Sequence, residues 1–187
     1  MSRIVPAALL TLLFLAPASF ADTSKTISGP LSMAASVDKK ILVVRIGATT
    51  VKKYTIAVGT KVKPTPLGTF GVRHIVWNPS WVPPAEPWAK GKKPTPPAHP
   101  DNPMKVVKIF FQEPDYYIHG TDAEDSLGSR ASHGCIRMSE SDVAELAQYL
   151  MDHAGAQQSK DWYEAVKNSG KTADVKLPVN VPFVIGH

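Results

Sequence analysis

A proline-rich segment between residues 78 and 103 places the strongest constraint on the fold of this chain. Nine of the 17 prolines lie within it. Since proline lacks an amide N–H and fixes φ, neither a helix nor a central strand survives this density. Trp81 and Trp88 lie in the segment, which argues against plain disorder. We therefore expect a long loop, either a surface loop packed down by its tryptophans or a lid over a binding site.

The residues before and after this loop have the pattern of β-strands. Residues 40–46 and 50–58 are rich in β-branched side chains and are separated by Gly47-Ala-Thr, so they predict a hairpin. Further strands are expected at 70–77, 104–111 and 116–120, and short closing strands between 175 and 185, around two prolines.

Two helices are expected late in the chain. Residues 139–142 read Ser-Glu-Ser-Asp, the pattern of a capping box, and apolar residues at helical spacing follow until Gly155. Residues 159–168 predict a shorter helix that ends at Gly170 and turns three side chains inward: Trp162, Ala165 and Val166. The fold class predicted is therefore mainly β, with one or two late helices.

The first 21 residues have the pattern of a secretory signal peptide. Arg3 precedes an apolar stretch over residues 7–15, and Ala21 ends a small-residue cleavage pattern. This stretch is shorter than the ~20 residues that a membrane span needs. With no cysteine near the cut, we expect no lipid anchor. The expected product is an exported single domain, residues 22–187.

Loss of Arg3 leaves a formal charge of 20 − 16 = +4 on the expected product. The basic residues are scattered, with no basic helix and no aromatic-interleaved stripe. This pattern disfavours nucleic acid as a partner and fits an anionic cell wall or membrane surface better.

Cys135 is the only cysteine of the chain. In an exported protein it forms an intermolecular disulfide, is buried and inert, or is a free reactive thiol. A reactive thiolate needs a nearby histidine, a helix N-terminus, or both. A helix expected to start just after Cys135 would point its dipole at the sulfur. Of the candidate bases His133 and His119, we favour His119, because a strand laid beside the cysteine can aim a histidine at it.

Other residues near Cys135 also have candidate roles. The amides of Gly134 and Cys135 are candidate donors to an oxyanion. Arg137 either pairs with a substrate carboxylate or forms an ordinary surface ion pair. Tyr116 and Tyr117 alternate along a strand, so we expect one to face the core and the other to line a cleft.

Two motifs together resemble the signature of the L,D-transpeptidase catalytic domain family: H-G-T at 119–121 and S-H-G-C-I-R-M at 132–138. The resemblance includes P-T-P-L-G-T-F at 64–70, W-N-P-S-W at 77–81 and V-P-F-V-I at 181–185, and covers roughly residues 32–187.

The resemblance implies a β-sandwich or mixed-sheet domain and a cysteine acyltransferase that acts on peptidoglycan stem peptides without a cofactor or a metal. By position, Cys135 is the nucleophile, His119 is the base, and the carbonyl of Gly120 orients His119. The other implied site residues are Ser132, His133 and Gly134 in the oxyanion pocket and cysteine turn, and Arg137, Trp81 and Trp88 in substrate binding.

The implied reaction begins with attack of Cys135 on the third stem residue, a diaminopimelate, and releases D-Ala. An amine of another stem then gives a 3→3 cross-link, and an amine of an envelope protein tethers that protein to the wall. With water as acceptor the enzyme is an L,D-carboxypeptidase. The sequence does not choose between these acceptors. We expect a Gram-negative periplasmic location and a role in cell-wall biogenesis and cell shape.

Two functions of other classes are less well supported. His119, His133 and Cys135 are ligand types that zinc accepts, but they lack the paired spacing of zinc motifs. A non-catalytic wall-binding module is disfavoured because both His119 and Cys135 are intact. We expect the other histidines to be structural or surface residues: His74, His99, His153 and His187.

Overall fold

The computed structural model describes residues 28–187, so the predicted signal peptide lies outside the described residues. The strands are β1 (Leu31–Ser36), β2 (Ile41–Ile46), β3 (Thr49–Thr55), β4 (Val58–Gly59), β5 (Gly68–Trp77), β6 (Val107–Gln112), β7 (Tyr116–Thr121), β8 (Arg130–Ser132), β9 (Ile136–Ser139) and β10 (Ala173–Gly186). The helices are α1 (Glu140–His153) and α2 (Lys160–Ser169), with short 3₁₀ helices at Pro87–Ala89 and Glu124–Ser126.

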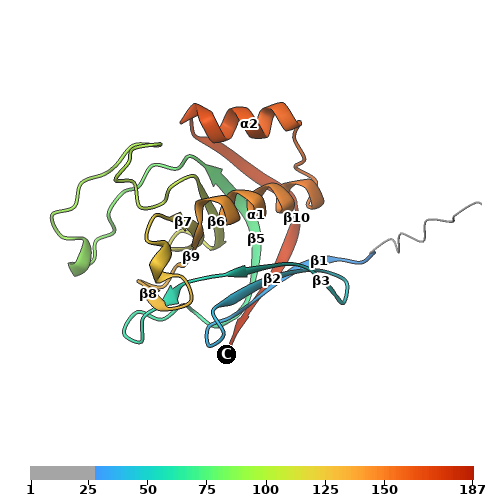
Figure 1. Cartoon of the computed structure of the whole chain (residues 1–187), viewed down its shortest axis with the longest axis horizontal. Coiled ribbons are helices and arrows are strands. Elements are labelled where there is room, and N and C mark those ends of the chain that lie inside the picture. Colours follow the sequence, from blue (N-terminus) through green and yellow to red (C-terminus); the bar gives the residue numbers. More distant parts are fainter. Residues whose placement is uncertain (1–27) are drawn as a thin grey trace, which may run out of the picture.

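Eight strands form one mixed sheet in the order β3-β2-β1-β10-β5-β6-β7-β9, and β4 and β8 form a small second sheet (Figure 1). The pairs β1–β10 and β7–β9 are parallel, and the other pairs of the large sheet are antiparallel. The predicted hairpin is β2–β3. The mainly β fold class with two late helices is confirmed.

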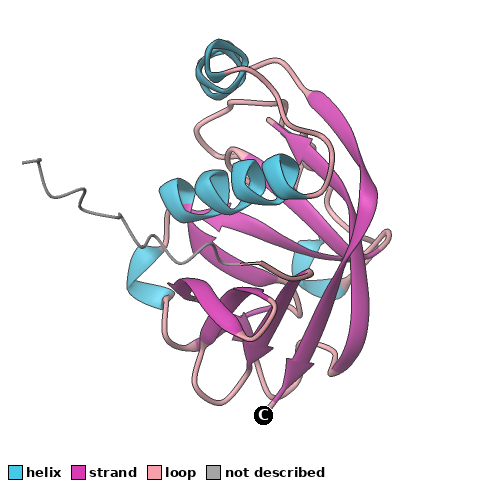
Figure 2. Cartoon of the chain, turned by 90° about the vertical axis from the view of Figure 1, so that its right-hand side faces the viewer, coloured by secondary structure: helices cyan, strands magenta, loops and turns pink. Residues whose placement is uncertain are grey.

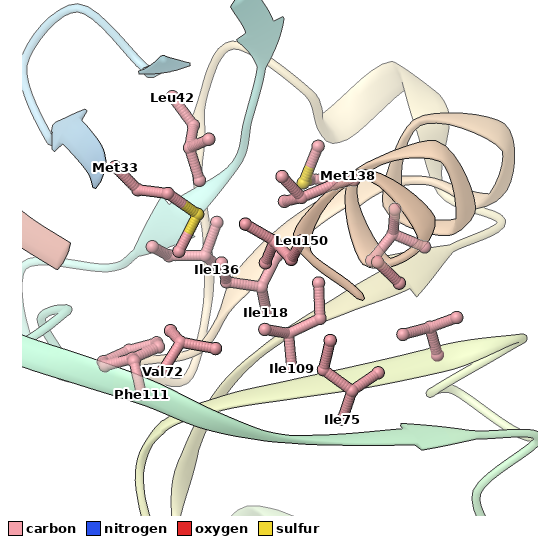
Figure 3. Packing of buried hydrophobic residues seen from close by; sticks show 14 of the residues in the cluster. Met33, Leu42, Val72, Ile75, Ile109, Phe111, Ile118, Ile136, Met138 and Leu150 are labelled. Carbon is pink, nitrogen blue, oxygen red and sulfur yellow. The ribbon is translucent and has the colours of Figure 1, made fainter. Parts of the chain in front are cut away.

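The large sheet is rolled, so that strands from its two ends approach each other (Figure 2). A bridge joins the ends, because the amides of Ala57 and Arg137 each donate to the other residue's carbonyl at 2.9 Å. Inside the roll, Met33 and Leu42 from one end face Ile118 and Ile136 from the other (Figure 3). The core therefore lies within the roll.

Helix α1 packs against β6, β7 and β9 and closes the core. The predicted N-terminal cap is present, since Ser139 Oγ accepts from the Asp142 amide at 3.1 Å. The buried side chains of α1 include Val143 and Leu150, as their helical spacing predicts.

Helix α2 also forms where it was predicted, from its cap Ser159 to Gly170 in the left-handed conformation. Its buried face differs from the prediction. Tyr163 and Val166 are buried, whereas Ala165 is exposed. Tyr163 replaces Ala165 because its hydroxyl reaches Asp152 of α1 at 2.7 Å, which satisfies the polar end of a buried ring.

The short closing strands predicted for residues 175–185 are instead part of one long strand, β10. Its pairing with β5 shifts register between Lys176 and Val181, and Pro178 lies in that interval. A local irregularity accommodates a residue that cannot donate to the ladder, so the strand continues past it.

The proline-rich segment is a long loop, as predicted, and its own hydrogen bonds fix its path. The backbones of Trp81 and Thr95 exchange two bonds of 2.9 Å. The Asn102 side-chain amide donates to the carbonyls of Pro79 and Pro96, at 2.8 and 3.0 Å. Within residues 28–187, no helix is long and apolar enough to cross a membrane.

Candidate active site

Three neighbouring strands present two parallel rows of side chains on opposite faces of the sheet. Ile109, Ile118 and Ile136 are register partners on β6, β7 and β9, and all three are fully buried in the core (Figure 3). The next row is Lys108, His119 and Arg137. Because side chains alternate along strands, this second row points away from the core. It lies in the wall of a pocket.

The pocket has a volume of about 620 Å³ and lies between the ends of β6, β7 and β9 and the proline-rich loop. It brings together almost every residue that the sequence nominated. The nominated residues lining it are Trp81, Trp88, His119, Ser132, His133, Cys135 and Arg137, and both Tyr116 and Tyr117 join them. The expectation that only one of the two tyrosines lines the cleft is therefore wrong. Tyr116 also packs against the core and so serves both regions.

Cys135 lies immediately before β9 with a half-buried, unpaired thiol. Its sulfur donates a weak hydrogen bond to the Asp115 carbonyl at 3.5 Å. Burial raises the pKa of the Cys135 thiol, and hydrogen bonding from the Tyr117 amide and hydroxyl opposes this without outweighing it. The resting group is therefore a thiol at neutral pH.

The predicted helix directly after Cys135 is wrong in its position. Strand β9 intervenes, and α1 begins only at Glu140. Four strand residues put the helix N-terminus roughly 13 Å from Cys135, and the effect of a helix dipole falls off within a turn. The dipole of α1 therefore does not account for thiolate formation.

His119 is almost fully buried, at 4% exposure, and its Nδ1–H donates to the Gly120 carbonyl at 2.7 Å. Burial and then the positive charge of Arg137 lower the pKa of His119 to about 3. The imidazole is therefore neutral, with Nε2 as its basic nitrogen. Among residues 28–187, the hydrogen bond of the Cys135 sulfur goes to the Asp115 carbonyl, and the sulfur forms no hydrogen bond with His119. Catalytic hydrogen bonds are often loose before a substrate binds.

Ser132 closes the cysteine turn. Its Oγ accepts from the Gly134 amide at 3.2 Å and donates to the Cys135 carbonyl. Gly134 has φ +114°, and a Cβ there would lie 2.9 Å from the Tyr116 ring. Only glycine fits this position, and its amide is engaged with Ser132.

The loop and the cysteine turn meet through aromatic rings. Trp88 stacks on His133 with ring centroids 4.1 Å apart and planes 12° apart. The Lys92 ammonium lies over both Trp88 and Trp81, at 5.1 and 5.9 Å from the ring centroids. Trp81 is buried and anchors the loop, whereas Trp88 is half-buried and reaches the pocket.

Arg137 is half-buried, and burial lowers the pKa of its guanidinium. No carboxylate within residues 28–187 lies within 4 Å of it. Nearby Asp122 pairs with Lys105 at 2.7 Å instead. The sequence left two roles open for Arg137, a pair with a substrate carboxylate or an ordinary surface ion pair. Among the described residues, Arg137 forms no such ion pair.

The sequence reasoning missed Lys108 and the effect of Tyr117, which lowers the pKa of the Cys135 thiol. The signal for Lys108 was a lysine set between apolar residues, two valines before it and Ile-Phe-Phe after it. Its place beside His119 depends on strand register, which the sequence does not show. Within residues 28–187, no group of three or more His, Cys, Asp or Glu side chains is arranged to hold a metal.

Comparison with known proteins identifies the family. The family model for the L,D-transpeptidase catalytic domain matches residues 33–181. The chain belongs to the L,D-transpeptidase catalytic domain family. The matched residues contain both the row of Lys108, His119 and Arg137 and the cysteine turn.

Curated L,D-transpeptidases of several bacteria are similar to this chain. Over 114 residues it is 38% identical to the probable L,D-transpeptidase ErfK/SrfK of Salmonella typhimurium, covering 57% of this chain and 35% of the relative. It is 36% identical over 104 residues to the probable L,D-transpeptidase YbiS of Escherichia coli, covering 52% and 34%. The putative L,D-transpeptidase YkuD of Bacillus subtilis is 30% identical over 121 residues, covering 65% and 61%. The aligned region thus spans about a third of the first two relatives.

Solved L,D-transpeptidases share the fold. The enzyme from Mycobacterium smegmatis superposes with a TM-score of 0.53 at 17% identity, covering 83% of this chain and 58% of that one. The enzyme from Xylanimonas cellulosilytica gives 0.50 at 17% identity, covering 84% and 61%. At these identities the likeness supports the L,D-transpeptidase fold alone.

Proposed function

We propose that this chain is an exported L,D-transpeptidase whose Cys135 is acylated by a peptidoglycan tetrapeptide stem. The observation that carries the proposal is the convergence of the single cysteine with a buried, neutral histidine in one pocket. The family and its bacterial relatives supply the substrate class.

Acylation begins when the donor places its scissile carbonyl beside Cys135. Rotation of the Cys135 side chain brings the sulfur from Asp115 toward His119. Nε2 of His119 then takes the thiol proton while the sulfur attacks the carbonyl carbon. The hydrogen bond from Nδ1 to the Gly120 carbonyl stabilises the imidazolium that forms.

The negative charge that develops on the carbonyl oxygen needs an amide donor. The Gly134 amide is engaged by Ser132, so we assign the Cys135 amide as the principal oxyanion donor. Ser132 holds the turn that aims this amide. Collapse of the intermediate breaks the C–N bond, and the His119 proton passes to the nitrogen of the departing D-Ala. A Cys135 thioester remains.

Deacylation reverses the roles of these groups. An acceptor amine attacks the thioester carbonyl, His119 removes a proton from that amine, and the proton returns to the Cys135 sulfur as the C–S bond breaks. A stem amine yields a 3→3 cross-link, and a protein amine yields a tethered protein. Trp88 and Trp81 form the wall of the pocket on the loop side, where we place part of the donor.

The proposal also covers export and domain organisation. The pattern of residues 1–21 supports cleavage after Ala21 and a catalytic domain at 22–187. With diaminopimelate-type donors, the periplasm of a Gram-negative cell is the proposed location.

Product analysis tests the function and separates its branches. The mature chain would be incubated with a disaccharide-tetrapeptide, beside Cys135→Ala, and the products separated by chromatography with mass detection. Release of D-Ala with a dimeric product supports the cross-linking enzyme, and a tripeptide indicates hydrolysis. Failure of folded protein to release D-Ala, both alone and with an added amine acceptor, would exclude the proposed donor.

A further inference from the structure

Four cations line the pocket, and among residues 28–187 three of them have no carboxylate oxygen within 4 Å. Lys63 pairs with Glu86 at 2.6 Å, and Lys92, which has no such partner, is exposed and lies over tryptophan rings. For Lys108 and Arg137, no carboxylate oxygen within residues 28–187 lies within 4 Å. Burial lowers the pKa of both groups. Two partly buried, unpaired cations in one pocket are costly unless an anion joins them.

Strand register places these two cations on either side of the histidine. Lys108 of β6 pairs with His119 of β7, and His119 pairs with Arg137 of β9. Since neighbouring strands are about 4.8 Å apart, the two cationic residues are roughly 10 Å apart at their backbones. Side chains as long as these can meet a single ligand in front of His119.

We propose that Lys108 and Arg137 form a carboxylate-binding pair that receives the α-carboxylate of the residue leaving the acyl donor. This inference rests on the proposed function, because it takes its ligand from that donor. It adds Lys108 to the site as a specificity-determining residue and gives Arg137 a defined ligand.

Covalent geometry selects this carboxylate over the others of a stem peptide. His119 must protonate the nitrogen of the leaving residue. In that residue the carboxylate carbon lies only about 2.5 Å from the nitrogen, since two bonds separate them. A donor correctly placed for proton transfer therefore carries a carboxylate into the space between Lys108 and Arg137.

The pair also bears on proton transfer. Positive charge on Lys108 and Arg137 disfavours the imidazolium form of His119. A carboxylate bound between them offsets this charge where the imidazolium forms. Correct donors would thus both occupy the site and ease the first step, whereas a donor with an amide at that position would do neither.

The surroundings of Lys108 are suited to this role. Its Nζ lies 4.8 Å over the Tyr117 ring and 3.3 Å from the Ser80 carbonyl. Tyr117 lines the same pocket as Cys135. These two neutral contacts hold the ammonium beside the nucleophile and leave its charge uncompensated.

The test compares two donors that differ only at this carboxylate. A tetrapeptide ending in D-Ala and the same peptide ending in the D-Ala carboxamide would be used to acylate Cys135 in the wild type, Lys108→Met, Lys108→Arg and Arg137→Met. Lys53→Met, which removes an exposed lysine of β3 outside the pocket, is the control. Melting temperatures would confirm that each variant is folded.

For the carboxylate donor, Lys108→Met and Arg137→Met should each lower kcat/KM by about 10- to 100-fold, the effect of losing a charged hydrogen bond. The carboxamide donor should react slowly with the wild type and should not be slowed further by Lys108→Met. Lys108→Arg should restore the preference for the carboxylate, and Lys53→Met should match the wild type. Equal loss on both donors, or no preference in the wild type, would overturn the pair and leave the proposed function intact.

A binding measurement distinguishes failure of the carboxylate-binding pair from failure of the proposed function. Calorimetry with Cys135→Ala and both peptides reports donor binding without turnover. If the wild type is acylated by neither peptide but Cys135→Ala binds the carboxylate form in a Lys108-dependent manner, the pair stands and the proposed function falls. If Cys135→Ala binds both peptides equally, the pair falls.

Discussion

His119 and Arg137 are register partners on the parallel strands β7 and β9, so the candidate base lies directly beside a guanidinium. This arrangement and burial hold the pKa of the His119 imidazole at about 3. Burial raises the pKa of the Cys135 thiol. The free protein therefore contains a neutral pair, a thiol and an imidazole, and not a preformed thiolate–imidazolium pair.

The neutral pair predicts how Cys135 alkylation depends on pH. In the absence of donor, the rate with iodoacetamide should keep rising with pH beyond the usual thiol pKa of about 8.5. The rate can be measured by intact mass on the wild type, with Cys135→Ala as the blank. A rate that is already constant between pH 5 and about 8 would instead reveal a stable ion pair.

Acid should destabilise the fold through His119. Since the pKa of the folded-state imidazole is about 3 and an unfolded histidine titrates near 6.5, the unfolded state binds the extra proton between these values. The contribution of His119 to the free energy of unfolding is therefore fully present above pH 6.5 and is lost as the pH falls toward 3. The loss is up to about 1.4 kcal/mol per pH unit. Urea unfolding would be measured at several pH values for the wild type and His119→Asn. This contribution to the slope of the unfolding free energy against pH should be present in the wild type and absent from His119→Asn. Parallel slopes would contradict the burial of a neutral His119.

Substitution of Gly134 should disable the cysteine turn. A side chain there adopts a strained φ of +114° and meets the Tyr116 ring at 2.9 Å. We expect Gly134→Ala to lose roughly 1–3 kcal/mol of stability and most of its turnover. Gly128→Ala is the matched control, since Gly128 has φ +83° but only an ordinary 3.9 Å contact. It should share the strain and keep its activity. Full activity in folded Gly134→Ala would show that the turn does not depend on this residue.

Trp88 should affect donor use more than stability. Its stacking on His133 is an aromatic contact of about 0.5–1.5 kcal/mol, and the side chain is only half-buried. Trp88→Ala should therefore lower kcat/KM for the donor by about 3- to 10-fold with a small change in melting temperature. Trp88→Phe should restore most of the loss. Unchanged kinetics in Trp88→Ala would mean that the loop does not take part in donor binding.

The sequence was informative where a pattern is local. The Ser139 cap, the helical spacing of α1 and the hairpin β2–β3 depend on residues a few positions apart, and the structure confirms all three. The cysteine motif nominated Cys135, and the expected strand beside it, together with the family resemblance, nominated His119. Strand β9 was missed because its four residues are too few to show alternation.

Features that depend on register or on the path of a loop could not be read from the sequence. The row of Lys108, His119 and Arg137 exists because three strands pair with one particular alignment. The stacking of Trp88 on His133 requires the proline-rich loop to fold back across the pocket. The burial that makes His119 neutral arises from packing of the whole domain, and no residue pattern encodes it locally.

The central claim is that Cys135 becomes acylated by a tetrapeptide stem, and intact-protein mass spectrometry tests it most directly. Wild-type protein and Cys135→Ala would be mixed with the disaccharide-tetrapeptide and sampled over time. We predict a covalent adduct on the wild type that equals the donor minus D-Ala, with none on Cys135→Ala. An adduct on both proteins, or a folded wild type that gains no mass while the donor stays intact, would contradict the account.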